Sequence, residues 1–172
     1  MRAPYLVSMN YRIATVFAVL VFLSACGRGG SGEEVGEFKN DLYGNEIKVQ
    51  ALKDPKVEGV TCHLTYFDRG VLDRAVKGNW FEDPSNSSIA CRQTGAIRIG
   101  RIDTGKDGEL VFSQRQSPVF KHIGVRRVYD AENETLMYIV YSRKPIEGSA
   151  KMNLSTVALY GQDVVWTGGV PQ

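Results

Sequence analysis

Short runs of alternating apolar and polar residues are the feature that most restricts the fold of this chain. Within residues 47–51, apolar residues at the odd positions alternate with Lys48 and Gln50, and the run stops at the turn signal Asp54-Pro55. A period of two places alternate side chains on the same face of a β-strand. Because no segment keeps a helical period for more than about two turns, the pattern predicts a mainly β fold.

The same pattern predicts where the other elements lie. Further strands are expected at 60–67, 88–93, 110–115, 125–129, 136–141 and 154–159, and one short helix is expected at Val71–Lys77. Residues 130–134 form a polar connector of hairpin length, and the strand after it is apolar on both faces, as in the centre of a sheet. We therefore expect a single domain over 35–160, an antiparallel β-sandwich or partly open barrel with at most one or two short helices, and a loose tail at 161–172.

The N-terminus has the pattern of a secretory signal. Arg12 precedes Ile13–Leu23, an uncharged run, and small residues follow at Ser24 and Ala25. At about 1.5 Å per residue, this run covers roughly half of a ~30 Å hydrocarbon core, so it is too short for a stable membrane span. Residues 1–25 therefore predict a signal peptide, and Met9 gives a more compact one than Met1, which favours Met9 as the true start.

Leu23–Cys26 also resembles the bacterial lipobox, in which the cysteine is acylated and becomes the new N-terminus. The match predicts lipidation of Cys26, and two or three acyl chains anchor a protein stably to a membrane. Gly27, where an inner-membrane signal has Asp, favours the outer membrane, and residues 26–34 have the composition of a flexible tether. A plain signal peptide, which would leave the protein free in the periplasm, and an uncleaved anchor are the alternatives.

Two cysteines remain once Cys26 is assigned to the lipid. Cys62 and Cys91 each lie on the apolar alternation of a strand-like run, where a disulfide would join two strands of a protein in an oxidising compartment. The alternative is a redox-active or metal-binding pair. That reading lacks a C-x-x-C motif, and His63 and His122 are the only histidines, so we predict a structural disulfide and no metal site.

Charge and motifs exclude several classes of function. The chain has 21 Lys and Arg against 19 Asp and Glu, and Arg2 and Arg12 in the signal account for the excess. A neutral mature protein argues against binding nucleic acid. Signatures of serine hydrolases, zinc peptidases and nucleotide-binding proteins are absent, so we predict no catalytic residue and no cofactor.

Basic residues gather in the second half of the chain, and Arg126, Arg143 and Lys144 form the candidate binding surface. Acidic residues lie among these cations, so ordinary solvated strand faces are the competing interpretation. Arg127 differs from its neighbours because it shares the apolar alternation of Val125 and Tyr129. If that position is buried, Arg127 needs a carboxylate partner, and a structural ion pair is expected.

Several segments, taken in their order along the chain, together resemble the CreA family of bacterial periplasmic proteins. They are Asp83–Asn86, Ile89–Gly95, Val111-Phe112 through Arg115, Val119–Lys121, Arg127–Ala131, Tyr138, Tyr141-Ser142 and Glu147–Ser149. The similarity runs from about Ile47 to Leu159. It implies a secreted single domain with paired cysteines at Cys62 and Cys91 and no established activity. A lipobox is not general in that family, so the prediction of an anchor depends on Leu23–Cys26 alone.

Two classes of function fit these features. The favoured one is a non-catalytic envelope module that binds a partner protein, a glycan or another cell-wall component through one face of its sheet. The alternative is an enzyme that acts on an envelope component through an active site without a recognisable motif, since such a site can be assembled from residues distant in sequence.

Overall fold

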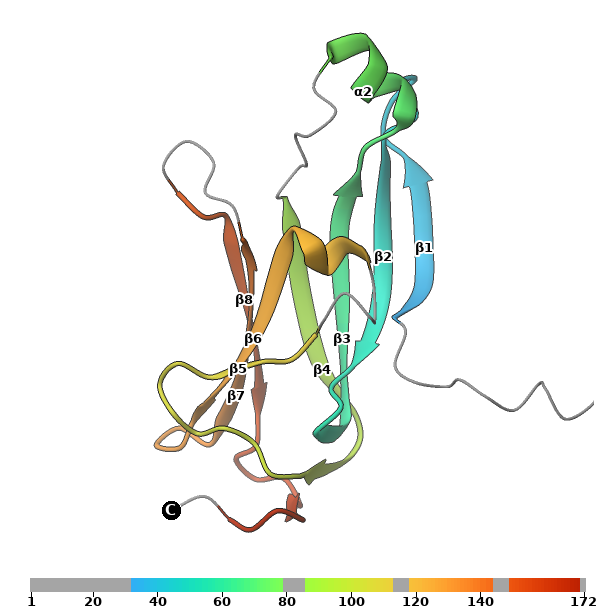
Figure 1. The fold of residues 1–172 in the computed structure, drawn as a ribbon. Coiled ribbons are helices and arrows are strands. Elements are labelled where there is room, and N and C mark those ends of the chain that lie inside the picture. Colours follow the sequence, from blue (N-terminus) through green and yellow to red (C-terminus); the bar gives the residue numbers. More distant parts are fainter. Residues whose placement is uncertain (1–31, 79–85, 113–117, 144–148, 171–172) are drawn as a thin grey trace, which may run out of the picture.

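The computed structural model describes residues 32–78, 86–112, 118–143 and 149–170. In chain order the elements are β1 (Glu33–Lys39), β2 (Glu46–Lys53), β3 (Val57–Asp68), α2 (Val71–Lys77), β4 (Ser87–Ile99), β5 (Glu109–Leu110), η2 (Pro118–Lys121), β6 (Ile123–Asp130), β7 (Thr135–Ser142), β8 (Met152–Ala158) and β9 (Val165–Trp166). Figure 1 shows strands running through most of the molecule and the helix α2 at one end. The prediction of a mainly β fold is confirmed.

The strands form two sheets arranged as a sandwich. One has the order β1-β2-β3-β4-β9 and the other β5-β6-β7-β8. All neighbours pair antiparallel except β4 and β9, which are parallel. The strand that is apolar on both faces, β7, lies between β6 and β8, in the central position that its sequence predicts.

The core lies where the inner faces of the two sheets meet. Leu64 and Val60 on β3 and Leu136 and Val140 on β7 are buried there at alternate positions, as a period of two requires. Phe112 and Phe120 stack in the same core with ring centroids 5.7 Å apart.

Strand β4 also lies beside β8, although no ladder joins them. Asn153 Oδ1 accepts a hydrogen bond from the backbone N of Ile89 at 3.1 Å, and Ser155 Oγ accepts one from the backbone N of Cys91 at 2.8 Å. Side chains of one strand therefore satisfy the backbone of the other. These contacts join the two sheets along one side of the sandwich.

Several predicted boundaries differ from the structure; β4, for example, ends at Ile99 and not at residue 93. β1 begins at Glu33, inside the segment expected to be tether, and it shows little apolar alternation because most of its side chains are exposed. β9 lies inside the expected tail, where Trp166 packs edge-on against Tyr129 at 5.4 Å between centroids. The strand expected at 110–115 is described only as far as residue 112, and of those residues only Leu110 lies in a strand, the short β5.

Cys62 and Cys91 form a disulfide, as predicted. The two residues face each other across the β3–β4 ladder, and both are buried in the core. A bridge inside the core, remote from solvent, fits a structural role.

Arg127 is buried, and its carboxylate partners are Asp54 and Glu109. Its Nη2 lies 2.6 Å from Glu109 Oε2, and its Nη1 binds Asp54 Oδ2. Tyr138 OH donates to the same Asp54 oxygen at 2.9 Å, and burial raises the pKa of Tyr138 far above its ordinary range. The expected structural ion pair is therefore present, extended to a network between the β2–β3 turn and the other sheet.

Candidate functional site

The inner face of β2 changes from apolar to polar towards the α2 end of the sandwich. Leu52 faces the core, whereas Lys48 and Gln50, on the same face, line a cleft of about 370 Å³. The apolar positions 47, 49 and 51 therefore point to the outer face of the sheet. The alternation predicted from sequence is correct, but the polar set is the one that faces inward.

This polarity follows from where the second sheet ends. Figure 1 shows β2 and β3 extending towards α2 beyond η2 and the start of β6. The upper inner face of the first sheet therefore lacks an apolar partner sheet and carries hydrophilic residues. The cleft is lined by Glu34, Lys48, Gln50, Tyr66, Phe67, Asp68, Arg69, Arg74, Val119 and His122. Its volume is at the lower end of the range typical of small-molecule sites.

Gln50 is the most informative residue of the cleft. Only 8% of it is exposed, and its Nε2 donates to Tyr66 OH at 3.1 Å. Its Oε1 is buried without a hydrogen-bond partner among the described residues. A buried acceptor left unpaired costs about 1–3 kcal/mol, so this amide is either strained by the fold or provided for a ligand.

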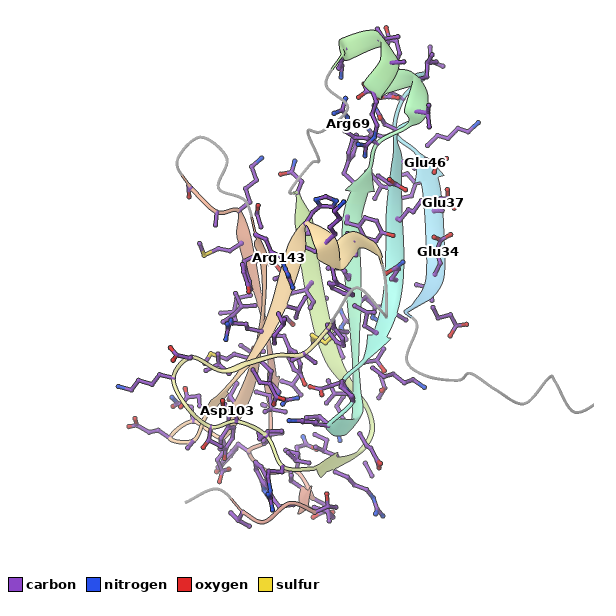
Figure 2. All side chains as sticks on the ribbon, viewed as in Figure 1. Glu34, Glu37, Glu46, Arg69, Asp103 and Arg143 are labelled. Carbon is purple, nitrogen blue, oxygen red and sulfur yellow. A yellow bond between two sulfur atoms is a disulfide. The ribbon has the colours of Figure 1, made fainter. Side chains whose placement is uncertain are left out.

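Lys48 lies among carboxylates on β1, β2 and β3. Its Nζ is 3.4 Å from Asp68, 3.5 Å from Glu37, 3.8 Å from Glu46 and 3.9 Å from Glu34. Figure 2 shows Glu34, Glu37 and Glu46 in a column along the edge of this sheet, with Arg69 on the side towards α2. Burial lowers the pKa of Lys48, but the hydrogen bond to Asp68 and the surrounding carboxylates outweigh it, so that pKa is raised.

Two of these carboxylates are linked to each other. The hydrogen bond between Glu37 and Glu46 lowers the pKa of Glu37 and raises that of Glu46. The linked pair therefore holds one proton more readily than two separate glutamates would. Among the residues that line the cleft, Glu34 and Asp68 are acidic, and we call Arg69, Arg74 and His122 the basic wall.

Asp73 holds the basic wall in place. Its carboxylate accepts a hydrogen bond from Arg69 Nε at 2.7 Å and pairs with Lys77 at 2.7 Å. The Lys77 hydrogen bond lowers the pKa of Asp73 to about 2, since it and the Arg69 contact outweigh burial. Arg74 Nε donates to the carbonyl of Arg69 at 3.4 Å, so both arginines are positioned by contacts near the start of α2.

The predicted basic surface is placed elsewhere. Arg126 Nη1 donates to the carbonyls of Asp107 at 2.7 Å and Gly108 at 3.2 Å, and Arg143 Nε donates to the carbonyl of Ile123 at 3.1 Å. Both guanidinium groups thus support nearby backbone. Lys144, like the lipidation candidate Cys26, lies outside the described residues.

Arg126 is nevertheless surrounded by apolar side chains on the outer face of the second sheet. It faces Leu110 on β5 and Ile139 on β7, and Ile139 in turn faces Leu154 on β8. Leu110, Leu154 and Met152 are all exposed. This outer apolar face is a second candidate surface, and the double-sided apolar pattern of β7 was its signal in the sequence.

Two kinds of feature do not occur in the described parts of the chain. Within 32–78, 86–112, 118–143 and 149–170, no group of three or more His, Cys, Asp and Glu side chains has an arrangement that would hold a metal ion. Among those same residues, no helix has the length and apolar character needed to cross a bilayer.

Comparison with known proteins assigns the family. A family model described as CreA protein matches residues 19–162, which include every strand that lines the cleft. The chain belongs to the CreA family. It is 38% identical over 157 residues to Protein CreA of Escherichia coli strain K12, an alignment that covers 87% of this chain and 96% of the relative. The same values hold for Protein CreA of the O6:H1 and O157:H7 strains.

No solved structure matches this CreA family chain. The resemblance noted from Ile47 to Leu159 is confirmed and extends further towards the N-terminus. Sequence reasoning found the family, the disulfide and the buried arginine of this protein, but it did not find the cleft. The polar residues of the cleft have the same spacing as those of an ordinary solvated strand face. Only the position of the second sheet distinguishes a cleft lining from such a face.

Proposed function

We propose that this CreA family protein is a lipid-anchored envelope protein that faces the periplasm and binds a small polar component of the envelope in the cleft, without catalysing a reaction. Cys26 carries the lipid in this proposal, and Gly27 favours the outer membrane. Nucleic acid is not a partner, because the residues from Cys26 onward have equal numbers of cations and carboxylates.

The single observation that carries the binding role is the unpaired amide oxygen of Gln50. A ligand hydroxyl or N–H group would donate to it and remove the free-energy cost of a buried acceptor without a hydrogen bond. The neighbouring Tyr66 hydroxyl and the basic wall supply further hydrogen-bond acceptors and donors. Glycan and peptide fragments of the cell wall have such groups, so they are the ligand class that best matches the cleft.

Titration with cell-wall fragments tests the ligand. N-acetylglucosamine, a muramyl dipeptide and alanyl-alanine are added in turn to ¹⁵N-labelled protein, and amide shifts are followed. We expect one of these probes to shift residues of the cleft, and Gln50→Leu to weaken that binding at least roughly tenfold, while Gln162→Leu, at an exposed position, leaves it unchanged. Absence of shifts in the cleft with all three probes would reject this ligand class, and conversion of a probe to product would support the enzyme alternative.

Metabolic labelling tests the anchor. Cells that express the full chain are grown with an alkyne palmitate, and the purified protein is coupled to a fluorescent azide. The wild type should be labelled, whereas Cys26→Ser should not, because that cysteine provides the acylated atom. Equal labelling of both proteins would remove the anchor from the proposal and leave the cleft unaffected.

A second binding mode, with a partner protein, is supported by the outer apolar face around Arg126. Large exposed apolar patches mark protein interfaces, and arginine and methionine are enriched in them relative to the rest of the surface. Crosslinking in intact cells compares the wild type with Arg126→Glu and with Arg143→Glu. A partner lost only in Arg126→Glu would support this face, and identical partners in all three proteins would reject it.

A further inference from the structure

A β-bulge in the edge strand β1 places two glutamates on one face of the sheet. Residues 34 and 37 are three apart, so a regular strand would point them to opposite faces. The register of β1 against β2 shifts between Glu34 and Gly36. Before the shift Glu34 lies opposite Gln50, and after it Glu37 lies opposite Lys48, so both glutamates share the inner face with the cleft. Bulges on edge strands often re-aim side chains beside functional sites.

Carboxylates outnumber the lysines on this part of the inner face. Lys39 lies opposite Glu46 on the ladder and adds a second positive charge to that of Lys48. Arg69 of the basic wall pairs with Asp73 on α2 instead. Four carboxylates against two lysines leave two negative charges at neutral pH. The four carboxylates, between 3.4 and 3.9 Å from Lys48 Nζ, are those of Glu34, Glu37, Glu46 and Asp68, three of which Figure 2 labels along the edge of the sheet.

The unpaired oxygen of Gln50 lies on the side of β1. Nε2 of the same amide donates to Tyr66 OH on β3 at 3.1 Å, whereas a Cβ on Gly32, just before β1, would lie 3.3 Å from Oε1. The two ends of the amide are therefore turned to the two neighbouring strands. Side chains at opposite positions of a ladder have Cβ atoms about 4.5–5.5 Å apart, so the carboxylate of Glu34 and this amide oxygen are neighbours.

This corner of the cleft contains hydrogen-bond acceptors that need a donor. Gln50 Oε1 and the carboxylates of Glu34 and Asp68 can only accept hydrogen bonds. An ammonium group has three N–H donors and no acceptor, and its charge offsets the excess of carboxylates. Hydrogen bonds with a charged partner are roughly twice as strong as neutral ones. A hydroxyl or acetamido group would supply a single donor and leave the negative charge in place.

We infer that the cleft recognises a primary ammonium group of its ligand, which binds between the carboxylate of Glu34 and the amide oxygen of Gln50. The inference rests on the proposed binding role of the cleft and names the chemical group that selects the ligand. Such a group occurs at the free amino end of a peptide and on an amino sugar without its acetyl group. Acetylation of that nitrogen removes the charge and two of the three donors, so it should remove most of the affinity.

Matched pairs of probes that differ only in acetylation test this recognition. Alanyl-alaninamide is compared with N-acetyl-alanyl-alaninamide, and glucosamine with N-acetylglucosamine. Each compound is titrated into the ¹⁵N-labelled protein at about pH 6.5, where free amino groups of this kind are protonated. We expect at least one free amine to shift amides of the cleft and to bind at least about tenfold more tightly than its acetylated counterpart. The pair that shows this difference identifies a peptide or a sugar as the source of the ammonium group.

The outcomes separate this inference from the proposed function. Equal binding within both pairs, or tighter binding of the acetylated members, would overturn the ammonium inference while the cleft remains a binding site. Absence of shifts in the cleft with all four compounds and with the earlier probes would reject the proposed function together with it.

A pair of charge variants on β1 locates the group. Glu34→Gln and Glu33→Gln each remove one carboxylate at an exposed position, but Glu33 lies opposite Ala51, on the outer face of the sheet. We expect Glu34→Gln to reduce the preference for the free amine over its acetylated counterpart at least about threefold, and Glu33→Gln to leave it unchanged. The dispersion of the amide spectrum checks that both variants keep the fold. An unchanged preference in Glu34→Gln would overturn the inference, and so would an equal loss in both variants, because the total charge of β1 would then be responsible.

Discussion

Arg127 illustrates how a single buried charge specifies the packing of the two sheets. Among the described residues it is the largest side chain that is fully buried. Its partner Asp54 belongs to the β2–β3 turn, 73 residues earlier in the chain. Because an unpaired guanidinium in the core is very costly, the sandwich has to close with this turn against β6. We therefore expect the pair to select the arrangement of the two sheets more than it adds to net stability.

Removal of the Asp54 carboxylate should therefore be severe. We expect Asp54→Ala to lower the free energy of unfolding by about 3–5 kcal/mol, because Arg127 would keep only Glu109, which is partly open to solvent. Urea denaturation measures the change. Glu58→Ala, at an exposed position on the next strand, is the control and should change stability by less than about 0.5 kcal/mol. A loss below about 1 kcal/mol for Asp54→Ala would mean that the pair behaves like a surface ion pair.

Replacement of Gln50 should change stability in the opposite direction to replacement of Asp54. Replacement by Leu removes an acceptor that is buried without a partner, so Gln50→Leu should raise the free energy of unfolding by about 1 kcal/mol while it weakens ligand binding. Thermal and urea unfolding of the variant, beside Gln162→Leu, measure this. A clear loss of stability would show that the amide supports the fold, and the main support for the proposed function would disappear.

At the scale of elements, the contact of β4 with β8 depends on two short side chains. Asn153→Ala and Ser155→Ala each leave one backbone N–H group of β4 without its acceptor. We expect each change to cost about 1–3 kcal/mol and to accelerate hydrogen exchange at the amides of Ile89 and Cys91. Thr156→Ala, at an exposed position of the same strand, should leave both amides protected. Unchanged exchange in the two variants would mean that the strands are held by core packing alone.

The disulfide links the other edge of β4 to β3. It closes a loop of 29 residues, for which the chain-entropy model gives roughly 3.5 kcal/mol of stabilisation. The double variant Cys62→Ala with Cys91→Ala should therefore unfold roughly 10 °C lower than the wild type, measured by calorimetry. Reduced wild type should melt near the variant. A change of less than about 2 °C would indicate that the bridge constrains an unfolded chain that is already compact.

At the scale of the whole molecule, carboxylates with lowered pKa values predict sensitivity to acid. The pKa of Asp73 is about 2 when folded against an ordinary value of 3.8, and hydrogen bonds from Asn45 and Asn133 lower the pKa values of Asp41 and Asp130. Stability from such groups is fully present above the ordinary value and is lost as pH falls through the folded value. Glu46, whose pKa is raised, contributes with the opposite sign.

The melting temperature should therefore fall between about pH 4 and pH 2, and Asp73→Asn should melt lower than the wild type at pH 6 with a shallower fall below pH 4. Calorimetry across pH 2 to 6 gives both profiles. Parallel profiles for the two proteins would show that Asp73 does not contribute to the acid transition.

Local pattern in the sequence was sufficient for most of the elements. The alternation at 47–51 lies within β2, the apolar run at 136–141 lies within the central strand β7, and the helix expected at Val71–Lys77 has those limits in the structure. Periodicity succeeds here because each residue's side-chain direction depends only on the local backbone. The signal peptide and lipidation site predicted in the first 26 residues likewise depend on local sequence alone, and they remain predictions.

The tertiary structure decided which face of each element is covered. β2 has an apolar and a polar face, but only the end of the second sheet near η2 turns Lys48 and Gln50 into the lining of a cleft. In the same way, α2 buries Asp73 and exposes Leu72 because its partners are Arg69, Lys77 and the loop after β1. Periodicity reports that two faces differ. Which face is buried depends on chain segments far away in sequence, whose position only packing determines.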